Sequence, residues 1–257
     1  MIIGGSNMTN ENHSTRKRPL IFRGFKKLIK LFKKRPEIIN LNDKLEDKAI
    51  YISNHSAANG PFTLSLFFPK VFVPWGIHYM CENYKERWKY LYYVFYQQKL
   101  GYGKVKSFIV ATIFATFSKV LYNWMKVIPT YTDLRLMKTL KISADTLNSN
   151  EAVLIFPENS DNGYFDVLSK FNAGFVALSM FYHKKYNYDL PVYPIYFSSK
   201  YKMLLIDKPQ YIQEFVKKGY TREEIAEWFK KRTNELYMII KEIYYKRKKR
   251  RKHKIMS

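Results

Sequence analysis

Short apolar runs alternate with longer segments of helical periodicity along most of this chain. The runs are rich in β-branched and aromatic residues, a pattern that predicts strands. They are Lys48–Ser53, Val71–Trp75, Lys126–Thr130, Ala152–Phe156, Val192–Phe197 and Lys202–Ile206. Helices are predicted between and after them, at Glu82–Lys99, Val105–Trp124, Asp133–Leu147, Ala173–Lys185 and Arg222–Tyr245. This alternation predicts an α/β fold with a mixed, mostly parallel sheet flanked by helices.

Composition divides the chain into four parts. With 257 residues, 47% of them hydrophobic, the chain can bury one full-sized core, and we place this α/β domain at residues 41–245. Residues 1–15 form a predicted mobile N-terminus, residues 16–40 a basic amphipathic segment and residues 246–257 a mobile basic tail.

The net charge of +24 is concentrated near the two ends of the chain. Ten Lys or Arg residues and no acid lie between Arg16 and Arg35, and eight more lie between Lys246 and Lys254. A globular body with basic ends is typical of proteins that dock onto a polyanion, either an anionic membrane surface or nucleic acid. Because the domain between them resembles no common nucleic-acid module, we favour the membrane and expect no specific nucleic-acid partner.

The segment LIFRGFKKLIKLFKKR, residues 20–35, has the pattern of a helix that lies in a lipid interface. Its apolar residues fall largely on one side of a helix, and its lysines and arginines take the other side. Near an anionic leaflet each basic residue contributes about 1 kcal/mol, so this segment can hold a protein there without a spanning helix. A solvated amphipathic helix that packs on the domain is the alternative interpretation.

The longest apolar stretch, Phe108–Phe117, has ten residues, too few for a transmembrane helix. We interpret it as a helix packed in the core, with partial insertion into a membrane as the alternative. The first residues lack the pattern of a signal peptide. The single Cys81 excludes an internal disulfide and fits a reducing compartment. These features predict a peripheral protein on the cytoplasmic side of a membrane, without a transmembrane span.

The segment SNHSAANGPF, Ser53–Phe62, places a histidine directly after a predicted buried strand and ahead of a Gly-Pro turn. Asn54 and His55 therefore emerge at the carboxyl end of a strand, where open α/β sheets bind their ligands. A histidine that titrates near neutral pH is suited to remove the proton from a hydroxyl that attacks a thioester. A histidine with a structural role only is the alternative interpretation.

Two further segments, IFPENSDNGYF and LPVYPIYF, are expected to meet SNHSAANGPF at one edge of the sheet. Together the three resemble the glycerolipid acyltransferase family, which acylates 1-acylglycerol-3-phosphate and other lysophospholipids. The resemblance implies transfer of a fatty acyl group from an acyl carrier protein or coenzyme A thioester to a hydroxyl of a membrane glycerolipid or lysophospholipid. It implies no metal and no cofactor, because the acyl-ACP or acyl-CoA donor is a substrate.

In this family the Asn-His pair is followed, after four further residues, by an aspartate that orients the histidine, which acts as general base. Asn54 and His55 match. The aspartate position falls on Gly60 without a gap, or on Asn59 with one residue deleted, and neither is a carboxylate. Loss of the carboxylate that orients a catalytic histidine costs about 10⁴ in rate in serine proteases. We therefore predict that Glu158 substitutes for the aspartate.

The second family motif reads Phe-Pro-Glu-Gly-Thr-Arg, and its arginine is associated with the phosphate of the acceptor. Phe156, Pro157 and Glu158 match, and the next three residues differ. The segment IPTYTDLR resembles the family's Ile-Pro-Val-x-Arg element, with Thr132 at the arginine position and Arg135 three residues later. Because phosphate monoesters are normally held by positioned arginines or lysines, such an acceptor is a poorer candidate here.

The predicted site combines residues that match or replace these motifs. Catalytic roles are assigned to His55 and Glu158, with Asp161 and Asp166 as alternative carboxylates and Tyr164 at the acceptor entrance. Substrate contacts are assigned to Asn54, Asn59, Gly60, Pro157, Asn159, Ser160, Arg135 and Lys170.

Two other functions remain open. A lipid-binding relative that keeps the fold but has lost turnover is favoured by the missing aspartate. A basic nucleic-acid-binding protein is favoured by the charge and the many aromatic residues. The leading interpretation implies three partners, namely an anionic membrane surface, an acyl carrier protein or CoA thioester, and a lysolipid acceptor.

Overall fold

The computed structural model describes residues 20–56, 59–131, 133–159 and 163–256 of the chain. Within these residues the strands are β1 Glu37–Asn40, β2 Ile50–Ser53, β3 Phe72–Ile77, β4 Ile128–Thr130, β5 Ala152–Ile155, β6 Pro191–Ser198, β7 Met203–Ile206 and β8 Gln210–Tyr211. They form one sheet in the order β1-β7-β6-β2-β5-β3-β4, with β8 also paired to β6. Strands β6, β2, β5, β3 and β4 are parallel, whereas β7 and β8 run antiparallel to β6. The predicted mixed, mostly parallel sheet is confirmed.

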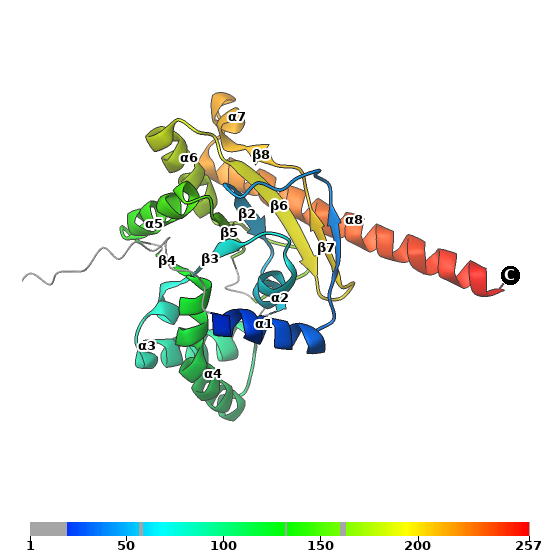
Figure 1. Cartoon of the computed structure of the whole chain (residues 1–257), viewed down its shortest axis with the longest axis horizontal. Coiled ribbons are helices and arrows are strands. Elements are labelled where there is room, and N and C mark those ends of the chain that lie inside the picture. Colours follow the sequence, from blue (N-terminus) through cyan, green and yellow to red (C-terminus); the bar gives the residue numbers. More distant parts are fainter. Residues whose placement is uncertain (1–19, 57–58, 132, 160–162, 257) are drawn as a thin grey trace, which may run out of the picture.

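Helices cover both faces of this sheet and extend beyond one end of it (Figure 1). Their bounds are α1 Leu20–Phe32, α2 Asn59–Phe67, α3 Tyr84–Lys89, α4 Lys104–Met125, α5 Leu136–Asn148, α6 Gly174–Tyr186, α7 Ile212–Lys217 and α8 Arg222–Met256. A 3₁₀ helix, η1 (His78–Cys81), and a π-helix, η2 (Tyr90–Lys99), flank α3. The predicted strands are present, and so are the predicted helices, with ends shifted by a few residues except at the end of α8. The helix predicted at Glu82–Lys99 is divided into α3 and the π-helix η2.

The central strands are buried on both faces, which explains why they occur as continuous apolar runs in the sequence. Ile50 and Ile52 of β2 pack in a core with α5, α6 and the first turns of α8. Tyr51, between them, points to the opposite face, where α2 contributes Leu64 to a second core. Alternating side chains of one strand thus anchor both layers of helices.

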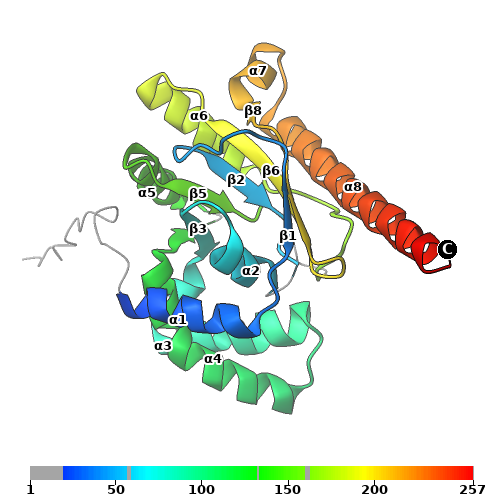
Figure 2. The ribbon, with the colours of Figure 1, turned by 45° about the vertical axis from the view of Figure 1, so that its right-hand side comes forward.

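The chain between β3 and β4 folds as a helical insertion, residues 78–125, made of η1, α3, η2 and α4. It has a small core of its own, in which Met80, Leu91 and Tyr96 surround Ala111 and Ala115 of α4. Figure 2 shows this insertion at the same end of the molecule as α1. The insertion places a helical layer beside the end of the sheet that carries α1 and α2.

The helices differ from the prediction at the C-terminal end of the chain and after β2. The Gly-Pro pair lies inside α2 rather than in a turn, because Pro61 occupies the first turn of a helix, where its missing N–H is not needed. The predicted mobile tail is helical as far as Met256, since Lys and Arg are good helix formers and the tail has no Gly or Pro. Residues 1–15 lie outside the described part of the chain.

The predicted basic segment, residues 16–40, contains both a helix and a strand. The helix, α1, lies where the amphipathic pattern places it. The strand, β1, was not predicted, because four residues with only two apolar side chains carry a weak signal. It pairs with β7, and Arg247 of α8 forms an ion pair with Glu37 at its start.

The prediction that Phe108–Phe117 packs in the core holds for one side of the helix only. Ala111 and Ala115 are buried in the core of the insertion, and Val110 and Phe114 pack against it, partly buried. Phe108, Ile113 and Phe117 are each more than half exposed. By length and apolar composition, α4 is the one helix among the described residues that reaches the requirement for crossing a membrane.

Candidate functional site

His55 lies at the carboxyl edge of the sheet, directly after β2 and the buried Asn54. Its half-buried imidazole stacks on the ring of Tyr164, with 4.8 Å between ring centroids and 25° between ring planes. The ring of Phe156 makes an edge contact on it at 5.1 Å. Since Phe156 directly follows β5, the parallel neighbour of β2, the first and second motifs meet at this edge as the sequence predicts.

A hydrogen bond from the main-chain N–H of His55 to Oε2 of Glu158, 2.9 Å long, joins these two motifs. Burial raises the pKa of Glu158, while hydrogen bonds from the main chain of His55 and Phe165 and the charge of Lys99 oppose the rise. The Glu158 carboxylate thus fixes the His55 segment through its main chain. Its predicted role toward the imidazole stays a prediction.

The second motif is held in place by a short antiparallel pairing with a later segment. The N–H of Asn159 donates to the carbonyl of Lys170 at 3.0 Å, and the N–H of Asn172 donates to the carbonyl of the buried Pro157 at 2.8 Å. Glu158 lies between these two bonds and forms an isolated antiparallel bridge with Phe171. The structure therefore brings Lys170 next to the motif, with its side chain exposed.

Asn54 is a buried connection between β2 and β6. Its side-chain amide donates to the carbonyl of Phe197 at 3.0 Å, and its Oδ1 accepts from the N–H of Phe197 at 2.8 Å. This pair of bonds extends the β2–β6 ladder by one residue beyond Ser53 and fixes the point where the chain leaves the sheet. The structure thus gives Asn54 a positioning role, whereas its predicted contact with substrate stays a prediction.

Gly60 packs directly against the main chain of His55. A Cβ atom at position 60 would lie 2.2 Å from the carbonyl oxygen of His55, far inside van der Waals contact. An aspartate at position 60, where the ungapped family motif has one, therefore does not fit this conformation. Asn59, the position given by the gapped alignment, is exposed at the start of α2 and has room for a longer or charged side chain.

Arg135 is engaged with its own neighbours. Its guanidinium forms a two-pronged ion pair with Asp133, with Nη2 2.7 Å from Oδ2, and lies 4.4 Å from the ring centroid of Tyr131. The hydrogen bonds from Arg135 lower the pKa of Asp133 to about 2. Because β4 is three strands from β2, at about 4.8 Å per strand, Arg135 follows a strand about 14 Å from the one that His55 follows. The structure does not bring Arg135 to the His55 site.

Three further predicted site residues divide between described and undescribed parts of the chain. Ser160, predicted to bind substrate, and Asp161 lie outside the described part of the chain. Asp166 accepts a hydrogen bond from the hydroxyl of Tyr237 at 3.2 Å, so its carboxylate is directed toward α8.

Two residues at this edge were missed by sequence reasoning. Lys99, at the end of η2, lies close enough to oppose the rise in the pKa of Glu158, but it comes from the insertion, where no motif points to it. His78 follows β3 as His55 follows β2, and its Nδ1 lies 3.2 Å from the carbonyl oxygen of Thr130. The rule that identified His55, a polar residue after a buried strand, applies to His78 as well.

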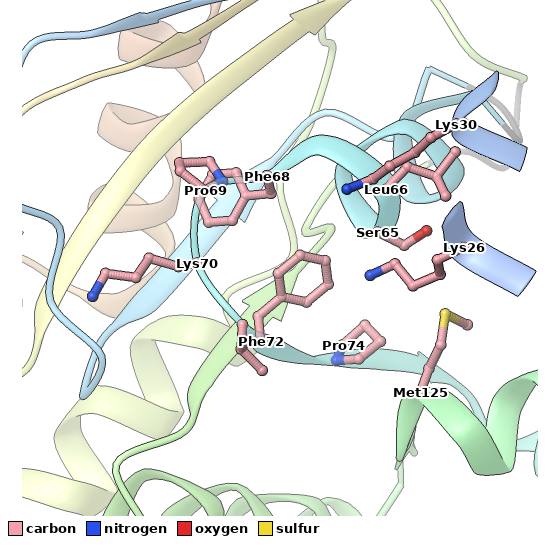
Figure 3. A pocket seen from close by; sticks show the side chains of 11 residues that line it. Lys26, Lys30, Ser65, Leu66, Phe68, Pro69, Lys70, Phe72, Pro74 and Met125 are labelled. Atoms are coloured by element: carbon pink, nitrogen blue, oxygen red, sulfur yellow. The ribbon is translucent and has the colours of Figure 1, made fainter. Parts of the chain in front are cut away.

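A separate hollow of about 190 Å³ lies at the opposite end of β3. Figure 3 shows the ammonium groups of Lys26 and Lys30, from α1, directed toward it. Apolar residues also line it, namely Leu66, Phe68, Pro69, Val71, Phe72, Pro74 and Met125. Lys70, also at the rim, forms an ion pair with Asp47 at 2.7 Å. The hollow therefore combines positive charge with an apolar surface.

Comparison of the sequence with protein-family models and with curated proteins found no match. Within the described residues, no group of three or more His, Cys, Asp or Glu side chains is arranged to hold a metal ion.

Proposed function

We propose that this protein is a membrane-associated acyltransferase. It moves a fatty acyl group from the thioester of an acyl carrier protein or coenzyme A to a hydroxyl of a glycerolipid or lysophospholipid acceptor. The observation that supports this most is the hydrogen bond between His55 and Glu158, since it joins the two segments that resemble the family's reactive motifs. The exposed Asn59 belongs to the first motif segment. The segment of Lys170 is joined to the second motif by main-chain hydrogen bonds. An acceptor would approach at these two places.

The proposed reaction uses His55 as general base. Its imidazole takes the proton from the acceptor hydroxyl, whose oxygen attacks the thioester carbonyl and forms a tetrahedral oxyanion. The oxyanion collapses, the C–S bond breaks, and the leaving thiolate receives the proton from His55, so an ester and a free thiol are formed. General-base assistance of this kind contributes about 10² to 10⁴ in rate.

Two features beside His55 support this chemistry. Glu158 and Gly60 both hold the His55 main chain, one by a hydrogen bond and the other by close packing. The N-terminus of α2 follows four residues after His55, and main-chain N–H groups at a helix start stabilise a developing negative charge. The N–H of Asn59 donates to the carbonyl of Ser56 and Pro61 has no N–H, so we propose that the N–H of Gly60 stabilises the oxyanion.

A lipid-binding relative without turnover is the second candidate. The close approach of Gly60 to His55 favours it, because this position cannot carry the carboxylate that orients the histidine in the family. In both readings the basic segment of residues 16–40 contacts an anionic membrane surface on the cytoplasmic side. The two differ only in whether an ester is formed.

The test is transfer of a labelled acyl chain from acyl-ACP and from acyl-CoA to a panel of lysophospholipids and glycerolipids. We expect His55→Gln to lower the initial rate by at least about 10², and Glu158→Gln to lower it less, because an amide can still accept the His55 N–H. His183→Gln, near the end of α6, is the matched control and is expected to leave the rate unchanged. An unchanged rate in His55→Gln contradicts the proposal. Wild-type protein that binds the lipids but forms no ester favours the relative without turnover.

A further inference from the structure

Helix α4 carries its large apolar side chains on the outside of the molecule. Six of them have exposed fractions between 46% and 76%, namely Val105, Phe108, Ile109, Ile113, Phe117 and Val120. Their spacing of mostly three or four residues puts them on one face of the helix, which we call the outer face of α4. Contiguous exposed apolar surface of this kind marks an interaction site in soluble proteins.

The fully buried residues of α4 are all small. Ser107, Ala111, Ala115 and Ser118 are completely buried against the rest of the helical insertion, while Val110, Phe114 and Tyr122 pack beside them and are only partly buried. In a water-soluble amphipathic helix the large apolar residues face the core, whereas most of those of α4 face outward. Small residues at the contact between helices and large ones outside are typical of helices whose outer surroundings are lipid.

The hydroxyl groups near the outer face are bonded within the helix. Oγ1 of Thr112 donates to the carbonyl of Phe108 at 2.8 Å, and Oγ1 of Thr116 donates to the carbonyl of Thr112 at 2.9 Å. Such bonds satisfy the hydroxyl donors without water. They lower the cost of moving this face into an apolar medium, where an unbonded hydroxyl is expensive.

The charged residues of α4 itself are all positive. Residues 101–132 contain lysines but no Asp or Glu, and Lys104, Lys106 and Lys119 belong to α4 itself. Helix α1 lies at the same end of the molecule in both views and exposes Leu28, Leu31 and further lysines (Figures 1 and 2). Lysines interspersed with exposed apolar residues match a surface of anionic headgroups above acyl chains.

We propose that the outer face of α4 inserts into one leaflet of an anionic membrane, with the helix axis along the membrane surface. The inner face stays packed on Leu91 and Tyr96 of the insertion, so the helix is embedded on one side and does not span. A second copy of the chain is the less suitable occupant, since its own α4 carries the same positive charge. The inference deepens the proposed function and rests on it for the choice of a membrane as partner, but it concerns binding and needs no turnover.

The test is flotation of the full chain with vesicles of phosphatidylcholine alone and of equimolar phosphatidylcholine and phosphatidylglycerol. The double variant Ile113→Glu/Phe117→Glu puts two acids on the outer face. Leu134→Glu/Val167→Glu is the matched control, because it makes the same charge change at exposed apolar positions outside α4. We expect the α4 variant to lower the partition coefficient on the anionic vesicles at least about tenfold more than the control does. An equal effect of the two variants overturns the proposal.

Two further measurements separate other outcomes. In a Cys81→Ser background, an environment-sensitive dye on Ile113→Cys is expected to shift to the blue on anionic vesicles, whereas no shift overturns insertion. If the protein self-associates without vesicles and the α4 variant abolishes this association, the outer face of α4 binds a second copy of the chain. That result also overturns the proposal. Vesicle binding through α4 by a protein that forms no ester leaves this inference intact and contradicts only the acyltransferase. If the protein transfers acyl groups but the α4 variant binds vesicles as well as the wild type does, only the inference about α4 is contradicted.

Discussion

The main-chain N–H of His55 donates to Oε2 of Glu158 over 2.9 Å, so this carboxylate positions the histidine through its backbone. In the family that the motifs resemble, the carboxylate comes from the segment that contains the histidine. Here that segment contributes Gly60, which packs against the His55 carbonyl. The acid, Glu158, comes from the loop that follows β5, the parallel neighbour of β2. The His55 segment is thus fixed from two sides.

The raised pKa of Glu158 predicts a specific pH dependence of stability. In the unfolded chain the carboxyl group of Glu158 loses its proton above the usual pKa of 4.5. In the folded protein the same group keeps its proton until the pH reaches its higher pKa. The free energy of unfolding of the wild type, relative to Glu158→Gln, should therefore fall as the pH rises through this window. Denaturant titrations at a series of pH values measure the difference.

Glu224→Gln is the control for this experiment, with the opposite sign. Hydrogen bonds from the N–H and hydroxyl of Thr221 lower the pKa of Glu224. Relative to this variant, the wild type should gain stability as the pH rises toward 4.5 and keep it above. A parallel pH dependence of the two variants contradicts the burial of Glu158.

Positions 59 and 60 should respond in opposite ways to the same substitution. Gly60→Asp forces a Cβ to 2.2 Å from the His55 carbonyl oxygen, so something must move. We expect a loss of about 1–3 kcal/mol in the free energy of unfolding, as for other overpacked sites, and a shift of the His55 ring. Asn59→Asp adds a carboxylate at the exposed start of α2, which should stabilise the helix by about 0.3–1 kcal/mol.

The outcome is read from thermal or denaturant unfolding together with the NMR shifts of the His55 imidazole. Gly60→Ala separates size from charge, because it adds the Cβ alone. If Gly60→Ala and Gly60→Asp both unfold as the wild type does, the close contact of Gly60 with His55 is wrong.

Asn54→Ala should destabilise the fold through its effect on β6. The substitution leaves the buried N–H and carbonyl of Phe197 without the partners they have in the wild type. Since each buried group left unsatisfied costs about 1–3 kcal/mol, we expect a loss of about 2–4 kcal/mol in the free energy of unfolding. Asn172→Ala, with an exposed side chain, is the matched control and should change it by less than about 0.5 kcal/mol. Equal effects of the two variants argue against the positioning role of Asn54.

Asp207→Ala tests how α8 is attached to the sheet. Asp207, at the end of β7, is buried and accepts two hydrogen bonds from Arg232 of α8, at 2.6 and 3.0 Å. Because Arg232 is partly exposed, we expect Asp207→Ala to lower the free energy of unfolding by about 2–4 kcal/mol, somewhat less than the loss of one partner of a fully buried pair. Glu242→Ala removes an ion pair that is exposed on both sides and should cost less than about 0.5 kcal/mol. Chemical denaturation of the two variants gives the comparison.

The sequence by itself determined the central strands and the longer helices and their order, but not β1, β8, α2 or α7. Runs such as Ala152–Phe156 are apolar over their whole length because both faces of a central strand are covered, and this property is local enough to read directly. The position of His55 after β2 follows from the same pattern, and so does the meeting of the first two motifs, since parallel neighbouring strands end at one edge.

Only the tertiary structure decided which surfaces and partners these residues have. The period of α4 is that of any helix, but whether Phe108 or Ala111 faces the core depends on the space left by η2 and α3. The bonds of Glu158 to His55 and of Asn54 to Phe197 join residues 103 and 143 positions apart, and the tight fit at Gly60 depends on how α2 turns back toward β2. Such contacts arise from the packing of whole elements, which the spacing of residue types along the chain does not encode.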